Sequence, residues 1–200
     1  MGTMEDLRVT ACTRCPELVD CRSRIVNGTG PADADVLLVG EGPGANEDEQ
    51  GEPFVGRSGT VLNEQLRAVG LDRETVRITN CVRCRPPENR DPTKTELENC
   101  REYLEREIDR LDPDVIVTLG KVPSEHLLGR SVAVTKEAGD VVDVRIEGAP
   151  RRVMICVHPA ATLYDRSQEA TFEAALQRAA ELAGVDAGDN GSGQTRLDGF

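Results

Sequence analysis

The stretch DVLLVGEGPGANEDEQGEPFVGRSG, residues 35–59, decides how the rest of the chain is interpreted. It begins with a short apolar run that is typical of a buried strand. It continues through a loop rich in glycine and carboxylates, which leads into a helix-compatible run at 60–69. Ordinary connections between a strand and a helix take about two to six residues. A loop this long indicates a segment that binds something.

Four apolar runs, the first of them inside this stretch, have the continuous hydrophobicity of strands buried on both faces of a parallel sheet. They are residues 35–39, 76–79, 115–119 and 153–157. Helix-compatible segments alternate with them. These are residues 60–68, 94–110, 122–128 and 168–182. The alternation predicts an α/β fold, a three-layer α/β/α sandwich around a central, mainly parallel four-stranded sheet, to which residues 133–150 add a less regular hairpin.

Two regions are expected along the chain, a domain at 1–183 and a tail at 184–200. The tail is rich in Gly, Asp and Asn, and it is too polar to order itself. Its end, QTRLDGF, resembles the short peptide by which replication and repair proteins dock on the sliding clamp. Gln194, Leu197 and Phe200 would make that contact. Chance is the competing explanation of so short a match.

The charge balance is strongly acidic, with 36 acidic against 24 basic residues, a net charge of −12 and only three lysines. Acid excess with arginine in place of lysine is typical of a protein from a salt-rich, halophilic cytoplasm, and an acidic mesophilic protein is the alternative. DNA is not excluded as a partner, because counterion release is already weak in concentrated salt. The polar N-terminus and the lack of a long apolar run predict a cytoplasmic protein without a membrane span.

The unusual residues fall where the predicted strands end. The glycine-rich loop follows the first strand, Asn80 and Cys81 follow the second, Gly120 follows the third, and His158 follows the fourth. Ligands of open α/β sheets bind outside the carboxyl ends of the strands. We therefore expect these residues to converge on one face.

The cysteines are expected to be reduced, so that closely spaced pairs favour a metal site over disulfides. Two C-x2-C pairs predict a tetrahedral zinc site. That set is Cys12, Cys15, Cys81 and Cys84. The competing choice is four thiolates suited to an iron–sulfur cluster. That set is Cys12, Cys15, Cys84 and Cys100. The spacing leaves the choice open.

The remaining thiols have simpler interpretations. Cys81 lies directly at a strand end, where its side chain can be a core residue. Cys156 lies within the fourth strand and is expected to be a small buried hydrophobe. Cys21 is either a spare thiol or a substitute ligand.

Three segments, taken together with the cysteine set, resemble the family-4 uracil-DNA glycosylases. They are GEGPGANEDEQGEPFVGRSG at 40–59, TNCVRCRPPENRDP at 79–92 and VHPAATL at 157–163. The resemblance extends from Cys12 to about Leu182. It implies an enzyme that removes uracil from single- or double-stranded DNA in base excision repair, acting as a monomer. It also implies a 4Fe–4S cluster held by Cys12, Cys15, Cys84 and Cys100, with Cys81 outside the ligand set.

Such an enzyme takes the target base out of the stack and holds it in a pocket. Phe54 is the leading stacking platform, and a loop anchor in the core is the alternative. The side-chain amide of Asn80 can accept from uracil N3–H and donate to O4 at once, although Asn80 is also a plausible strand-end turn residue.

Cleavage builds negative charge on the departing uracil. His158 is expected to donate a hydrogen bond to it, with backbone N–H groups around Gly42 helping, an arrangement of the oxyanion-hole type. The competing role for His158 is a structural turn before Pro159. The other histidine, His126, is expected to be a surface or packing residue.

Three carboxylates lie in the loop near the expected pocket. The resemblance implies that Glu47 lies near the base, where it would exclude the methyl group of thymine, and Glu41 is expected to order the loop or the attacking water. A solvated loop acid is the alternative for both. Asp48 is as plausibly a solvated acid. The group that activates the water is not assigned.

The segment HPAATL is expected to meet the DNA backbone, with the start of a helix near a phosphate. Leu163 is predicted to fill the space left by the flipped nucleotide, or else to be core. Members of the family commonly have arginine after this leucine, and here Tyr164 replaces that charge. Other candidate phosphate contacts are Arg57, Arg83, Arg85 and Arg90.

Two further hypotheses compete with the enzyme. The first is a non-catalytic DNA-binding module that carries zinc or a cluster on the same fold. The second is a small-molecule phosphate-binding protein that uses the glycine-rich loop, although this loop lacks the lysine and hydroxyl of a P-loop.

Overall fold

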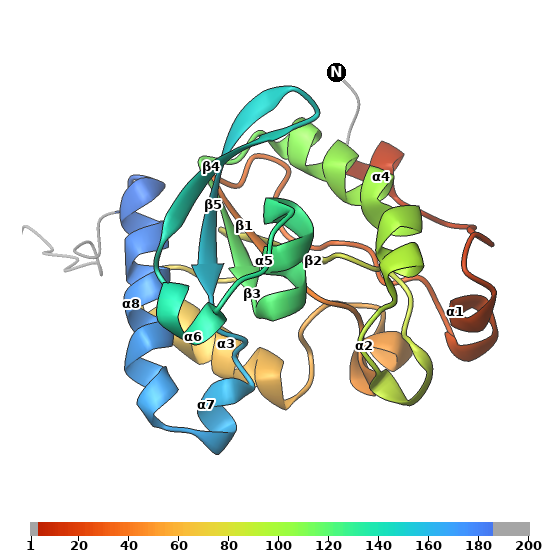
Figure 1. Ribbon diagram of the computed structural model, residues 1–200, viewed down its shortest axis with the longest axis horizontal. Helices are drawn as coiled ribbons and strands as arrows, with labels where there is room; N and C mark the ends of the chain where they lie inside the picture. Colours follow the sequence, from red (N-terminus) through yellow and green to blue (C-terminus); the bar gives the residue numbers. More distant parts are fainter. Residues whose placement is uncertain (1–3, 186–200) are drawn as a thin grey trace, which may run out of the picture.

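The computed structural model describes residues 4–185, and its centre is a five-stranded sheet in the order β2-β1-β3-β5-β4 (Figure 1). The strands are β1 (Val36–Gly40), β2 (Arg77–Asn80), β3 (Val115–Leu119), β4 (Val141–Ile146) and β5 (Ala149–Cys156). All pairings among β1, β2, β3 and β5 are parallel. The predicted α/β fold with a mainly parallel sheet is confirmed, and the fifth strand comes from the segment predicted as a less regular hairpin.

The additional strand is β4, which pairs antiparallel with β5 as a hairpin. Glu147 and Gly148 connect the two strands, and both have positive φ angles, 49° and 81°. Two such residues are what the tight turns of β-hairpins require. Most of β4 is only partly buried, which explains why its sequence lacks the continuous apolar pattern of the other strands.

The helices cover both faces of the sheet. They are α1 (Pro16–Cys21), α2 (Ala45–Gln50), α3 (Arg57–Ala68), α4 (Lys94–Leu111), α5 (Lys121–Leu128), α6 (Val134–Glu137), α7 (Ala161–Tyr164) and α8 (Ser167–Leu182), with short 3-10 turns η1 (Met4–Leu7) and η2 (Pro87–Asn89). The start of α4 is fixed by a capping box between Thr93 and Glu96. Among the described residues, no helix is both long and apolar enough to cross a membrane.

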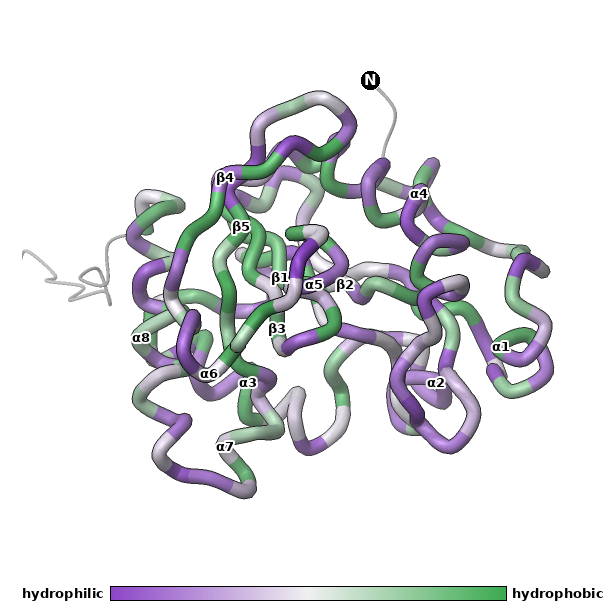
Figure 2. The backbone as a smooth tube through the Cα atoms, in the orientation of Figure 1, coloured by the Kyte–Doolittle hydropathy of each residue, from purple (hydrophilic) through white to green (hydrophobic). Residues whose placement is uncertain are grey.

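Alternation along the buried strands divides the core in two. In β1, Leu38 packs into the cluster that α3 and α8 cover, whereas Leu37 packs into the cluster on the side of α4 and α5. Figure 1 shows these helix pairs on either side of the sheet, and Figure 2 shows hydrophobic residues concentrated along the central strands. The result is the predicted three-layer sandwich.

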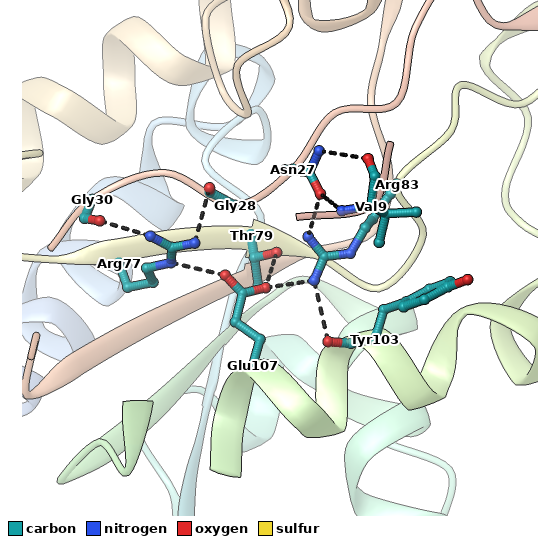
Figure 3. Close-up of polar contacts among 9 residues, drawn as sticks. All are labelled: Val9, Asn27, Gly28, Gly30, Arg77, Thr79, Arg83, Tyr103 and Glu107. Carbon is teal, nitrogen blue, oxygen red and sulfur yellow. Dashed lines mark hydrogen bonds and ion pairs between the residues drawn. The ribbon is translucent and has the colours of Figure 1, made fainter. Parts of the chain in front are cut away.

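A buried ion network ties β2 to α4 (Figure 3). The carboxylate of Glu107, which is 1% exposed, accepts from Arg77 Nε at 2.8 Å, Arg83 Nη2 at 2.7 Å and Thr79 Oγ1 at 2.9 Å. Burial opposes the charge of Glu107, yet the two guanidinium groups hold the pKa of this carboxyl below its ordinary value. Arg83 is therefore inside the protein, and its prediction as a phosphate contact is wrong.

Candidate functional site

The predicted convergence of strand ends is found in a cavity of about 180 Å³. Its lining comes from the glycine-rich loop, the end of β2 and the residue that follows β5. The lining residues are Glu41, Gly42, Gly44, Glu47, Phe54, Ser58, Asn80 and His158. Six of the seven residues predicted for catalysis or base binding are thus brought together, and Leu163 lies elsewhere. Gly44 and Ser58 were missed, although both lie within the loop that directed attention to this site.

Phe54 belongs at once to this cavity and to the core cluster under α3. Its backbone has a left-handed φ of 56°, and Arg73 stabilises this conformation by donating to the carbonyl oxygens of Pro53, at 3.0 Å, and of Phe54. A Cβ at Gly59 would lie 1.8 Å from the same carbonyl oxygen of Phe54. The position of Phe54 is therefore compatible with both predicted roles, because its buried ring lines the cavity and also packs in the core.

The position of Asn80 requires a glycine, Gly40, at the paired position of the neighbouring strand β1. Asn80 ends β2, is buried, and pairs in register with Gly40 at the end of β1. A Cβ at Gly40 would lie 2.4 Å from Asn80 Oδ1 and 2.6 Å from Phe54 Cζ. Glycine at this position lets the amide and the ring both close in on the cavity.

His158 is held as a neutral ring of defined tautomer. The backbone N–H of Ala160 donates to His158 Nδ1 at 3.1 Å, so that Nδ1 carries no proton. Burial lowers the pKa of the imidazole, against a smaller opposing effect of Glu47. The proton of the neutral ring therefore lies on Nε2. His158 can donate through Nε2 without carrying a positive charge.

Glu47 uses its carboxylate to shape the loop. Oε1 accepts from the backbone N–H groups of Val55 and Gly56, both at 3.0 Å, and Oε2 accepts from that of Gly44 at 3.1 Å. The last bond also caps α2, a helix inside the loop. The loop is long partly because it contains this helix.

The other two loop carboxylates differ from each other. Glu41 lines the cavity, and burial, with a further contribution from neighbouring Asp91, raises the pKa of its carboxyl to about 7. Asp48 is buried and accepts from the backbone N–H groups of Ser23, at 2.9 Å, and Arg24, at 3.3 Å. Asp48 is thus neither solvated nor part of the cavity lining, and it fastens the loop to the N-terminal segment.

Leu163 and Tyr164 are the exposed large hydrophobic residues of the described chain, at 45% and 82% exposure. They lie on α7, whose first residue, Ala161, donates from its backbone N–H to the His158 carbonyl at 2.8 Å. The core alternative for Leu163 is therefore wrong. Leu163 and Tyr164 thus follow His158, a residue of the cavity lining, within a few residues along the chain.

The arginines predicted to contact phosphates differ in whether their side chains already have partners in the protein. Arg57 is exposed at the start of α3. Arg85 donates to Asn89, whereas Arg90 is paired with both Glu96 and Glu17.

A second, small cavity is lined by four cysteines together with arginine, asparagine and apolar side chains. These cysteines are Cys12, Cys15, Cys84 and Cys100. Within residues 4–185, no three His, Cys, Asp or Glu side chains are already close enough to hold a single metal ion. Four cysteine thiolates are the donor set of an iron–sulfur cluster and also of a tetrahedral zinc site.

The remaining cysteines lie outside this cavity lining. Cys81 belongs to the core on the α4 side, and burial raises the pKa of its thiol well above the ordinary value. Cys156 lies in the core on the other face, as predicted. Cys21 is half-buried at the end of α1. The set with Cys81, which the spacing allowed, is not the one that the fold assembles.

The predicted clamp-binding residues Gln194, Leu197 and Phe200 lie outside the described residues.

Comparisons with known proteins agree with the fold. The model of the family described as the uracil DNA glycosylase superfamily matches residues 27–180. The chain is 37% identical over 190 residues to the type-4 uracil-DNA glycosylase of Archaeoglobus fulgidus, covering 92% of this chain and 95% of that one. It is 42% identical over 176 residues to the Thermotoga maritima type-4 uracil-DNA glycosylase, covering 84% and 90%. It is 36% identical over 190 residues to that of Sulfurisphaera tokodaii, covering 92% and 86%.

Proposed function

Because this chain belongs to the uracil DNA glycosylase superfamily, with type-4 enzymes among its relatives, we propose that it hydrolyses the N-glycosidic bond of uracil in DNA. The product is an abasic site, and the role is base excision repair. The observation that carries the proposal is the neutral His158 in one cavity with Phe54 and Asn80.

The cavity supplies the groups that bind a flipped uracil. The ring of Phe54 stacks on the base, an interaction worth about 1–3 kcal/mol. Asn80 accepts from N3–H and donates to O4, so that one amide reads the edge that distinguishes uracil from cytosine. Both groups are buried before substrate arrives, which limits the entropy lost on binding.

Bond cleavage leaves negative charge on the uracil ring, and His158 stabilises it. Nε2–H donates to O2 as the charge develops, and the backbone N–H at Gly42 assists. A neutral donor keeps its proton through the reaction, so the departing base leaves as an anion. The fixed Nδ1 contact with Ala160 orients the ring beforehand.

We propose that Glu41 orients the water that attacks the sugar. Its carboxyl lines the cavity and ionises near neutral pH, so it can orient a water through a hydrogen bond. Glu47 acts by positioning the loop, because its oxygens already accept three backbone N–H groups.

Contact with DNA is proposed for the apolar pair on α7. Leu163 enters the space left by the flipped nucleotide, and Tyr164 stacks on a neighbouring base. Stacking loses less strength in salt than phosphate contacts do. This suits a protein of net charge −12.

A 4Fe–4S cluster fits the cysteine cavity. Its donor set is four thiols, and the described lining includes Arg14, Arg22 and Arg83 but no carboxylate or imidazole. Positive side chains favour an anionic thiolate cluster. When bound, the cluster cross-links the N-terminal segment to the region around Cys84 and Cys100. No step of the reaction requires it.

We also propose that residues 1–183 form a single catalytic domain, which is active as a monomer.

The tail that follows this domain is proposed to recruit a sliding clamp. A pull-down with the cognate clamp tests this recruitment. Deleting residues 194–200 should abolish capture, and unchanged capture would contradict the proposal.

The function is tested with an oligonucleotide that contains one uracil, followed by alkali. We expect strand breakage at the uracil and none when thymine or cytosine replaces it. Asn80→Asp keeps the size of the side chain but loses both amide donors, so breakage should fall sharply. Binding of the oligonucleotide without any abasic product would instead support the non-catalytic module.

A further inference from the structure

Arg22 lies between the two halves of the cysteine cavity. It directly follows α1, and its guanidinium donates from Nη1 to Cys84 Sγ at 2.8 Å and from Nη2 to the backbone carbonyl of Cys12 at 2.7 Å. Cys84 is 62 residues away along the chain. One planar side chain thus fastens the N-terminal cysteine segment to the segment that follows β2.

The sulfur of Cys15 has a hydrogen-bond donor too, and this donor is neutral. Cys15 Sγ lies 3.5 Å from Asn99 Nδ2. Among the described donors to these sulfurs, Arg22 is the charged one.

We propose that Arg22 is the positioning residue that sets the reduction potential of the cluster and its retention by the protein. The inference rests on the cofactor proposed above. Hydrogen bonds to ligand sulfurs, together with net charge and solvent exposure, set the potential of iron–sulfur clusters. A guanidinium at Cys84 stabilises the reduced, more negative state. Arg22 therefore makes the potential less negative than the four thiolates alone would.

The same contacts retain the cluster. Hydrogen-bond partners of metal ligands typically contribute about 10- to 100-fold in metal affinity. Arg22 has a further effect, since its second nitrogen holds the Cys12 backbone in place. Lysine cannot replace both contacts, because it lacks the rigid fork of the guanidinium.

The test uses full-length protein with its native cluster, in the wild type and in the variants Arg22→Leu and Arg22→Lys. Arg24→Leu is the matched control, because it removes the same charge two residues away from an exposed side chain. The first readout is the reduction potential from an anaerobic redox titration followed by absorbance. The second is the rate at which an iron chelator removes the cluster.

We expect Arg22→Leu to shift the potential to more negative values and to lose its cluster about 10- to 100-fold faster than the wild type. Arg22→Lys should lie between the two, and this variant serves if Arg22→Leu does not fold. Arg24→Leu should match the wild type in both readouts. A role limited to folding would leave the potential unchanged in the variants that retain a cluster.

Two outcomes would overturn the inference, and they are distinguishable. In the first, the wild-type protein is brown, and the Arg22 variants match it in reduction potential and in the rate of cluster loss to the chelator. This outcome contradicts the role of Arg22 but supports the proposed cofactor. A colourless wild type without iron removes the cofactor, and the inference with it.

Discussion

The ring centroids of Phe54 and His158 lie 5.8 Å apart, with the ring planes inclined by 32°. In the proposed mechanism, the ring that stacks on the base and the group that donates to it are therefore neighbours before substrate arrives. Phe54 is held by its left-handed backbone and by Arg73, and His158 by the N–H of Ala160. The proposed catalysis depends on that preorganisation.

Replacing Phe54 by leucine should weaken binding of uracil-containing DNA by about 1–3 kcal/mol, or roughly 5- to 150-fold, because an apolar residue remains but the ring is lost. Binding can be measured by fluorescence anisotropy. Phe172→Leu is the matched control, since Phe172 is fully buried in α8 and does not line the cavity. Equal affinity of the Phe54 variant and the wild type would argue against the stacking role.

Gly40→Ala should raise KM and lower kcat, although the backbone at this position is not in the left-handed region. The added methyl would lie 2.4 Å from Asn80 Oδ1 and 2.6 Å from Phe54 Cζ, so both side chains must move out of place. Steady-state kinetics, with circular dichroism as a check on folding, measures the effect. A folded variant with wild-type kcat/KM would show that the close approach is unimportant.

The rate of uracil release should rise as the pH increases through about 7, because the raised pKa of Glu41 leaves its carboxyl protonated at lower pH. Only the ionised carboxylate can orient the water as a base. Glu41→Gln should lower the rate and remove this inflection from the pH–rate profile. Glu49→Gln, at an exposed position on α2, is the control. An inflection that survives in the Glu41 variant would assign it to another group.

Glu107→Gln should destabilise the protein by about 3–5 kcal/mol, because it leaves Arg77 and Arg83 buried without their partner. Urea unfolding measures the change. Glu98→Gln breaks an exposed pair with Lys94 and should cost about 1 kcal/mol or less. A similar small cost for both variants would contradict the importance of the network.

The same network predicts a direction for stability against pH. The pKa of Glu107 is lowered by folding, so its contribution is fully present above the pKa of the unfolded chain. That contribution is lost as the pH falls through the lower, folded-state pKa. Glu107→Gln should therefore lose less stability on acidification than the wild type does.

The sequence predicted the sheet and most of the cavity because these features have local signals. Strands β1 and β3 are continuous apolar runs, and the residues of the cavity follow strand ends. Helix α2 was missed because ANEDEQ has no apolar periodicity. Strand β4 was under-predicted because it is only partly buried.

Other features depend on contacts that no local pattern contains. Arg83 has the appearance of a surface cation in sequence, yet its partner Glu107 lies 24 residues away on α4. Nothing in the sequence shows that the carboxylate of Glu47 accepts hydrogen bonds from three backbone N–H groups. The tautomer of His158 likewise depends on one backbone contact.

The most direct test of the account is the single-turnover rate of uracil release by wild type, His158→Leu and His126→Leu. His126 is the protein's other histidine and lies on α5, so its replacement controls for the loss of an imidazole. We predict that His158→Leu lowers the rate on the order of a hundredfold or more, because the donor to the departing base is lost. His126→Leu should release uracil at close to the wild-type rate. A His158→Leu enzyme that released uracil at the wild-type rate would contradict the central claim.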